Sequence, residues 1–191
     1  MMKIAILLGS VREGRQSHKI AHYLQARLQE KGITADLIDL AENPLLIMEI
    51  HPQPPPEVER IGVRLQEADA LLFVTPEYHG SFSGVIKNAI DYFWAEFQKK
   101  PIGVVTVSAG KMGGINASTQ LQHVILSLGA FALPTKLLVP EVKTAFDDSF
   151  QPVNESVIKS ADKFLDEYLW FADAVYQKKS VNKQIALGKS L

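Results

Sequence analysis

The chain alternates short apolar runs with longer segments of helical period, and this alternation constrains its fold more than any other feature. Five runs are rich in Ile, Leu and Val: KIAILL (3–8), ADLIDL (35–40), ADALLFV (68–74), IGVVTV (102–107) and TKLLVP (135–140). The first, third and fourth are almost continuously apolar, which is typical of strands that are covered on both faces. In the longer segments apolar residues recur at the 3.6-residue period of a helix, as Ile20, Leu24 and Leu28 do.

Alternating strands and helices predict an open parallel sheet with helices on both sides, because crossovers between parallel strands are right-handed. We therefore expect an α/β protein with three layers and a doubly wound, five-stranded parallel sheet. Such sheets bind ligands outside the carboxyl ends of their strands. The loops after the first, third and fourth strands are then the ones to search, and all three have unusual sequences.

Length and composition are those of an ordinary globular domain. The chain has 191 residues, 47% of them hydrophobic, and a formal net charge of −1, so we expect one domain with its own core. The absence of cysteine excludes thiol catalysis, iron–sulfur clusters and cysteine-based zinc sites. The small net charge argues against nucleic acid as a partner. No apolar stretch approaches the roughly 18 to 20 residues that cross a bilayer, so we expect a cytoplasmic protein without a membrane partner.

Two segments depart from the alternation. The proline-rich segment 42–58 predicts a long surface loop with exposed apolar residues at 45–48, because proline lacks an amide donor and restricts the residue before it. The periodicity is lost near the end of the chain. We assign residues 1–176 to the single domain and 177–191 to a C-terminal tail that is mobile or packs on another subunit.

The first loop, GSVREGRQSHK (9–19), predicts an anion site that is not a triphosphate site. Gly9 and Gly14 have the P-loop separation, yet Arg15 and Gln16 stand where that loop needs Lys and a Ser/Thr magnesium ligand. The dinucleotide pattern G-x-G-x-x-G is absent as well. What remains is a cup for one terminal phosphate at the start of a helix, where free amides and the helix dipole favour an anion. Its candidate ligands are Ser10, Arg12, Arg15 and Ser17. The competing interpretation is an ordinary turn with a serine cap.

The second loop, in 75–94, and the third, in 107–118, favour a planar ligand. Tyr78 and His79 supply aromatic surface beside glycines that let a flat ring approach the main chain. The third loop, VSAGKMGGINAS, exposes backbone amides at its glycines ahead of the next helix. A phosphate cup and two ring-binding loops at neighbouring strand ends together suggest a mononucleotide with a large aromatic head.

The segments LLGSVREGRQS and PEYHGSFSGVIKNAIDY resemble the two signatures of the NADPH-dependent FMN reductase family, flavodoxin-like flavoenzymes that include azo-dye, quinone and chromate reductases. The resemblance extends from about Met2 to Val139. It implies the strand order 2-1-3-4-5, a bound FMN, and NADPH or NADH as substrate. The implied ligands of the FMN phosphate are Ser10, Arg12, Gln16 and Ser17. The implied neighbours of the rest of the flavin are Pro76, Glu77, Tyr78, His79, Gly80, Ser108, Gly110, Gly113 and Gly114.

The resemblance also implies a mechanism in which flavin N5 takes hydride from NAD(P)H and a small acceptor then takes the electrons. The expected acceptors are a quinone, an azo compound, free flavin or chromate. No catalytic residue is then required; His79 could donate a proton, although we expect it to pack against the ring. Many family members have Asn and Pro where this chain has His79 and Ser83, so substrate preference stays open.

The sequence also bears on a competing function, on metal binding and on the oligomeric state. A flavodoxin-like electron-transfer module without NAD(P)H activity is the competing function, although flavodoxins are strongly acidic and this chain is not. His18 and His22 have the i, i+4 spacing of a metal pair but no third ligand, so we expect no metal. We expect a homodimer or homotetramer, because a second subunit would cover the apolar residues at 45–48 and the aromatic helix end at 92–94.

Overall fold

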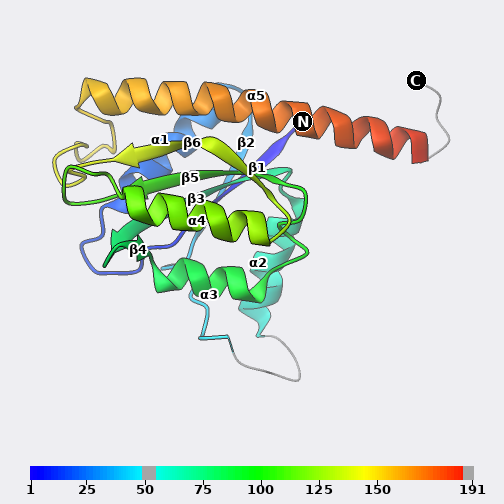
Figure 1. Ribbon diagram of the computed structural model, residues 1–191, viewed down its shortest axis with the longest axis horizontal. Helices are drawn as coiled ribbons and strands as arrows, with labels where there is room; N and C mark the ends of the chain where they lie inside the picture. Colours follow the sequence, from blue (N-terminus) through cyan, green and yellow to red (C-terminus); the bar gives the residue numbers. More distant parts are fainter. Residues whose placement is uncertain (49–54, 187–191) are drawn as a thin grey trace.

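The computed structural model describes residues 1–48 and 55–186, and its single sheet lies between two layers of helices (Figure 1). The parallel strands are β1 (Lys3–Leu8), β2 (Thr34–Asp39), β3 (Ala70–Tyr78), β5 (Pro101–Val107) and β6 (Phe131–Val139). A two-residue strand, β4 (Ser81–Phe82), pairs antiparallel with the end of β3. The parallel strands follow the order β2-β1-β3-β5-β6. Counted over these strands alone, this is the flavodoxin-like order 2-1-3-4-5, and the predicted fold class is confirmed.

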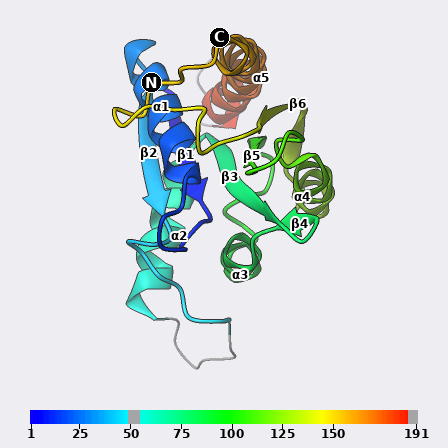
Figure 2. The same cartoon turned by 90° about the vertical axis from the view of Figure 1, so that its left-hand side faces the viewer.

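The helices divide between the two faces of the sheet, as Figure 2 shows. One face is covered by α1 (Ser17–Glu30) and α5 (Glu155–Ala186), the other by α2 (Pro56–Glu67), α3 (Gly84–Tyr92) and α4 (Ile115–Ser127). Along β1, Ile4 and Ile6 pack toward the first pair of helices, whereas Ala5 and Leu7 pack toward the other three. Burial on both faces explains why the first strand is continuously apolar. In the described ranges no helix combines the length and apolar character that a membrane span needs.

The proline-rich segment differs from its prediction at both ends. Helix α2 begins at Pro56, so the last residues of the expected loop 42–58 are helical; proline suits a first helical position, where its missing amide has no partner in any case. Leu45 is half-buried against the α2–α4 side of the core, whereas Leu46 and Ile47 are exposed. Residues 49–54 of this segment lie outside the described part of the chain.

Two other elements are longer than the apolar runs suggested. Strand β3 continues past residue 74 to Tyr78 and turns back at His79 and Gly80, whose φ angles are 51° and 78°. Helix α5 crosses the expected boundary at 176/177 and ends at Ala186. Residues 187–191 of the proposed tail lie outside the described residues.

The C-terminal end of α2 is held by a buried cation. Lys100 is 6% exposed, and its Nζ donates hydrogen bonds to the carbonyl oxygens of Leu65 (2.7 Å) and Gln66 (3.0 Å) in the last turn of α2. Burial is the main reason that the pKa of Lys100 falls to about 8, and Lys179 lowers it further. A positive charge at this end of a helix is also favoured by the helix dipole.

Candidate functional site

Loops after four of the parallel strands enclose a hollow of about 470 Å³ at the carboxyl end of the sheet. They include the three loops that the sequence singled out, after β1, β3 and β5, and a further segment after β6. The lining residues are Ser10, Arg12, Glu13, Gly14, Arg15, Gln16, Ser17, Pro76, Glu77, Tyr78, Val107, Ser108, Ala109, Val142 and Lys143. Polar groups from different elements thus meet where open α/β sheets bind their ligands.

The loop after β1 ends at the N-terminus of α1, which has no side-chain cap. Gln16 occupies the N-cap position, but its Nε2 donates to the carbonyl oxygen of Gly14 (2.9 Å) instead of capping the helix. Ser17, which begins the helix, is 1% exposed, and its Oγ has no hydrogen-bond partner within residues 1–48 and 55–186. A buried hydroxyl without a partner is costly. The hydroxyl of Ser17 and the first amides of α1 are therefore donors that an anion with acceptor oxygens could bind.

Arg15 is paired with a carboxylate. The sequence placed Arg15 among the phosphate ligands, but its two Nη atoms bind both carboxylate oxygens of Asp39, with Nη1 and Oδ1 2.5 Å apart. Nη1 also donates to the carbonyl oxygen of Ser10 (2.6 Å). Asp39 is the main reason that the pKa of Arg15 is raised above its usual value. Two parallel hydrogen bonds from a guanidinium to a carboxylate are a strong arrangement. Arg15 therefore lines the hollow with its positive charge compensated by Asp39.

Arg12 is placed differently. Its guanidinium carbon lies over the ring of Tyr78, 5.4 Å from the ring centroid, and its side chain is exposed at the hollow. This geometry is that of a cation–π contact, which is weak at an exposed site. Arg12 can therefore turn toward an anion at small cost.

The end of β3 and the short strand β4 form a tight hairpin that is fixed to α4. The Oε2 of Glu77 accepts hydrogen bonds from the backbone amides of Asn116 and Ala117, each at 3.0 Å, and so caps α4. Gln120 donates from Nε2 to the carbonyl oxygen of Gly80 (2.8 Å). Pro76, Glu77 and Tyr78 line the hollow. His79 and Gly80 form the turn of the hairpin beyond its rim.

The loop after β5 contributes less to the hollow than its glycines suggested. Ser108 lines the hollow, but Gly110, Gly113 and Gly114 do not. A Cβ on Gly113 would lie 2.8 Å from the Cβ of Leu138, and one on Gly114 would lie 2.8 Å from the Cβ of Thr106. Both glycines also have positive φ angles, 61° and 85°. Their absence of a side chain is required for close packing on the sheet.

Val142 and Lys143 line the hollow although the sequence analysis did not select them. Their segment is tied to the loop after β5, because the amide of Val142 donates to the carbonyl oxygen of Ser108 (3.1 Å) and the amide of Glu141 to that of Gly110 (3.0 Å). The signal that could have found them is position alone: they follow the carboxyl end of the fifth parallel strand. Glu13, Val107 and Ala109 also line the hollow; they lie in loops that the sequence analysis selected, but it did not name them as site residues.

His18 and His22 lie on α1 outside the lining of the hollow. The ring of Phe150 is stacked on His22, with centroids 5.2 Å apart, and meets His18 edge-on at 5.1 Å. Burial is the main cause of a lowered pKa at His18. These contacts make the pair part of the packing between α1 and the segment that follows β6.

Comparisons with known proteins agree with this architecture. The sequence pattern of the family described as NADPH-dependent FMN reductase matches residues 2–144. An FMN-dependent NADPH-azoreductase of Staphylococcus aureus is 32% identical over 184 residues, 90% of this chain and 96% of that protein. The corresponding azoreductase of Staphylococcus saprophyticus subsp. saprophyticus is 29% identical over 182 residues, 89% of this chain and 95% of the other.

Among solved structures, the chain is similar to FerB, a flavoenzyme NAD(P)H:(acceptor) oxidoreductase from Paracoccus denitrificans. The two superpose with a TM-score of 0.78 at 25% identity, covering 93% of this chain and 98% of FerB. An azoreductase from Bacillus anthracis shares the fold, with a TM-score of 0.56 and 13% identity over 91% of this chain and 100% of that one. The family match spans every strand of the sheet and every residue that lines the hollow. The chain belongs to the NADPH-dependent FMN reductase family.

Proposed function

We propose that this chain binds FMN in the hollow at the carboxyl end of its sheet and uses NAD(P)H to reduce a small acceptor. Membership of the family makes it an oxidoreductase of the NAD(P)H-dependent FMN reductase type. The acceptor, which we propose to be a quinone, an azo compound, free flavin or chromate, is the finer part of the proposal. The observation that carries the proposal is the buried Oγ of Ser17 at the uncapped start of α1.

The phosphate end of the site is the best defined. Ser10 and Ser17 are both almost fully buried, at 2% and 1% exposure, and both line the hollow beside the first turn of α1. Arg12 stands at the rim of the same hollow. Two hydroxyls, a movable guanidinium and the positive end of a helix dipole form a site that fits one terminal phosphate. We assign the FMN phosphate to it, with Gln16 as a further contact.

The remaining lining residues fit the rest of the cofactor. The hairpin residues Pro76, Glu77 and Tyr78 form one wall of the hollow, and Ser108 with Ala109 forms another. The cap that Glu77 makes on α4 holds the first wall in place, and a rigid wall preserves the orientation of a bound ring. We keep Gly110, Gly113 and Gly114 in the proposal as residues that shape this wall, and His79 and Gly80 as its outer edge.

When bound, FMN supplies a carrier that takes a hydride from the nicotinamide and gives up electrons to the acceptor. The protein then has to bind, orient and exclude competing reactions. We propose no catalytic acid or base: Glu77 is engaged with two backbone amides, and His79 stands at the turn outside the hollow.

Steady-state kinetics test the function directly. The purified protein should oxidise NADPH or NADH with a quinone, an azo dye or free FMN as acceptor. We propose that donor and acceptor use one open face of the bound flavin in turn, so initial-rate plots should give parallel lines as the second substrate is varied. Bound FMN without any NAD(P)H oxidation would favour an electron-transfer module, and the absence of both FMN binding and turnover would overturn the proposal.

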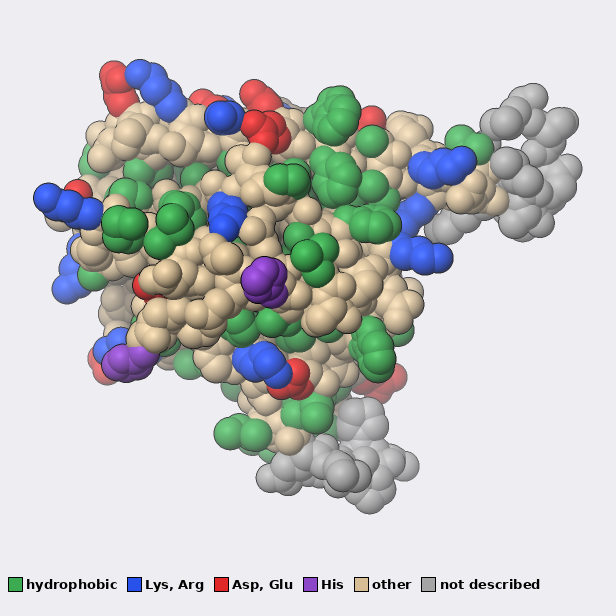
Figure 3. All heavy atoms as spheres, viewed as in Figure 1, with side chains coloured by type: hydrophobic (Ala, Val, Ile, Leu, Met, Phe, Trp, Pro, Cys, Tyr) green, Lys and Arg blue, Asp and Glu red, His purple; other side chains and the backbone are tan. Residues whose placement is uncertain are grey.

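We also propose that the protein is a homodimer or homotetramer. Large apolar side chains are exposed at Leu126, Phe131 and Trp170, with exposed fractions of 60%, 41% and 75%. They lie on α4, β6 and α5, and Figure 3 shows apolar side chains across the face that these elements form. A groove of about 600 Å³ between β6 and α5 adjoins Trp170. Soluble monomers seldom expose this much apolar surface. Light scattering that returns the monomer mass of 21.2 kDa at micromolar concentration would contradict this assignment.

A further inference from the structure

The ion pair between Arg15 and Asp39 connects a loop without regular structure to the end of β2, an edge strand of the sheet. Arg15 belongs to the segment between β1 and α1, and Asp39 is the last residue of β2. The side chains are 18% and 4% exposed. A pair this buried holds its two ends at a fixed separation, because breaking it leaves an uncompensated charge away from water.

The arginine end of the pair fixes the shape of the loop. Nη1 of Arg15 donates to the carbonyl oxygen of Ser10, and the backbone amide of Arg15 donates to the carbonyl oxygen of Arg12 (3.1 Å). One residue therefore closes the loop from both its main chain and its side chain. Ser10 and Ser17, the two buried serines of the hollow, lie on either side of this closure.

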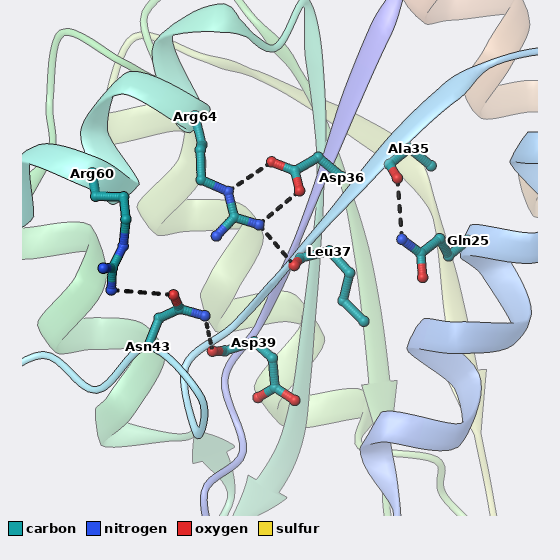
Figure 4. Close-up of polar contacts among 8 residues, drawn as sticks. All are labelled: Gln25, Ala35, Asp36, Leu37, Asp39, Asn43, Arg60 and Arg64. Carbon is teal, nitrogen blue, oxygen red and sulfur yellow. Dashed lines mark hydrogen bonds and ion pairs between the residues drawn. The ribbon is translucent and has the colours of Figure 1, made fainter. Parts of the chain in front are cut away.

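The aspartate end is itself anchored. Oδ1 of Asp39 accepts a hydrogen bond from the amide of Ala41 (2.9 Å), and the carbonyl oxygen of Asp39 accepts one from Nδ2 of Asn43 (2.9 Å). Figure 4 shows Asn43 between Asp39 and Arg60. Asp39 does not line the hollow. Among the described hydrogen-bond partners of its carboxylate, Arg15 is the one that lines the hollow.

We propose that Arg15 and Asp39 are positioning residues of the phosphate site: their pair holds the loop 9–17 in the shape that directs Ser10, Ser17 and the first amides of α1 at one phosphate. Arg15 is then not itself a phosphate ligand. This inference rests on the proposed function, because it concerns the site that we assign to the FMN phosphate.

The direction in which Asp39→Asn changes the affinity for FMN separates this role from its alternatives. Asp39→Asn removes a negative charge near the phosphate site and releases Arg15. If only charge mattered, or if Arg15 bound the phosphate directly, the variant would bind FMN more tightly. If the pair positions the loop, the variant binds FMN more weakly, although a repulsive charge has been removed.

The experiment compares FMN with riboflavin, which lacks the phosphate, by quenching of flavin fluorescence on the apoprotein. For Asp39→Asn and Arg15→Met we expect the preference for FMN over riboflavin to fall at least about tenfold, which corresponds to one hydrogen bond to a charged group. Riboflavin affinity should change little. The double variant should lose no more than either single one, because both remove the same pair.

Two further variants guard against trivial explanations. Arg15→Lys keeps the charge but not the fork geometry, so we expect it to retain the fold and still lose most of the preference for FMN. Asp36 lies on β2 like Asp39 and forms a bidentate pair with Arg64 of α2, whose Nε and Nη2 lie 2.8 and 2.6 Å from the carboxylate oxygens (Figure 4). Asp36→Asn breaks this pair. This matched control should leave the preference unchanged.

Each outcome decides the matter. Tighter FMN binding by Asp39→Asn, or a full preference for FMN in Arg15→Lys, would overturn the positioning role. Equal losses of FMN and riboflavin in Asp39→Asn would make the pair a general support of the fold, which also overturns it. A wild-type protein that binds FMN no better than riboflavin would instead contradict the phosphate assignment in the proposed function.

Discussion

Strand β2 carries two bidentate arginine–aspartate pairs that share their chemistry and differ in what they join. Arg64 reaches Asp36 from α2 and also donates to the carbonyl oxygen of Leu37 (2.9 Å), so it fastens one regular element to another. Arg15 reaches Asp39 from a loop. The side chains of the first pair are 27% and 43% exposed, those of the second 18% and 4%. The two pairs are alike in geometry and differ in burial and in the segment that the arginine belongs to, and this difference is why we propose a functional role for the Arg15–Asp39 pair alone.

The largest effect should separate the two pairs by stability. Asp39→Ala leaves the Arg15 guanidinium poorly hydrated and unpaired, and we expect it to lower the unfolding free energy by about 3 kcal/mol. Asp36→Ala disturbs a pair open to water, for which about 1 kcal/mol or less is expected. Urea unfolding of the two apoproteins measures both values. Equal losses would show that the difference in burial has no energetic consequence.

Arg12 lies in the same loop as Arg15 but has no carboxylate partner among the ion pairs found in the described residues, so it tests an arginine of this loop that is free to bind phosphate. Arg12→Ala should weaken FMN binding by roughly 10- to 150-fold, the equivalent of a hydrogen bond of about 1.5 to 3 kcal/mol to a charged group. Riboflavin affinity and the urea midpoint should stay close to wild type. Fluorescence titration with both flavins checks this, and an equal loss for both would assign Arg12 to the support of the loop.

The smallest effect is a pH dependence of stability that arises from Lys100, the cation at the C-terminal end of α2. Its pKa of about 8 in the folded state lies below the value of about 10.4 expected in the unfolded chain. Between these values the unfolded state binds the additional proton, so the unfolding free energy should rise with pH. From pH 8 to 9.5 we expect a rise on the order of 1 kcal/mol, which Lys100→Met should abolish. Parallel curves for the two proteins would be inconsistent with a buried, titrating lysine.

The sequence predicted the sheet well because alternation of apolar runs is a local signal that burial on two faces imposes. It failed where tertiary contacts decide. The proline-rich segment concealed the start of α2, since prolines that end one structure also begin a helix well. The extension of β3 and the antiparallel β4 depend on two positive φ angles at His79 and Gly80. Histidine is enriched at such angles but adopts them in only a small minority of cases, so it is a weak sequence signal.

The candidate site was predictable as a set of loops but not in its internal pairing. Ser10, Arg12 and Ser17 could be read from one continuous stretch of sequence. Arg15 could not be distinguished from Arg12 in this way, because its partner Asp39 lies outside the loop, at the end of β2. The glycines after β5 were interpreted as ligand contacts, which stays a prediction. The structure adds that Gly113 and Gly114 lie too close to the side chains of Leu138 and Thr106 to carry a Cβ.

The cap that Glu77 places on α4 has a consequence for motion. With Gln120 bound to Gly80 as well, the β3–β4 hairpin and the first turns of α4 are joined by side-chain hydrogen bonds in two places. Displacing this wall of the hollow therefore displaces a helix, and collective motions of helices take microseconds to milliseconds, whereas free loops move in nanoseconds to microseconds. The amides of Asn116 and Ala117 should then exchange with deuterium only when the hairpin opens, so that their protection reports how often the two separate.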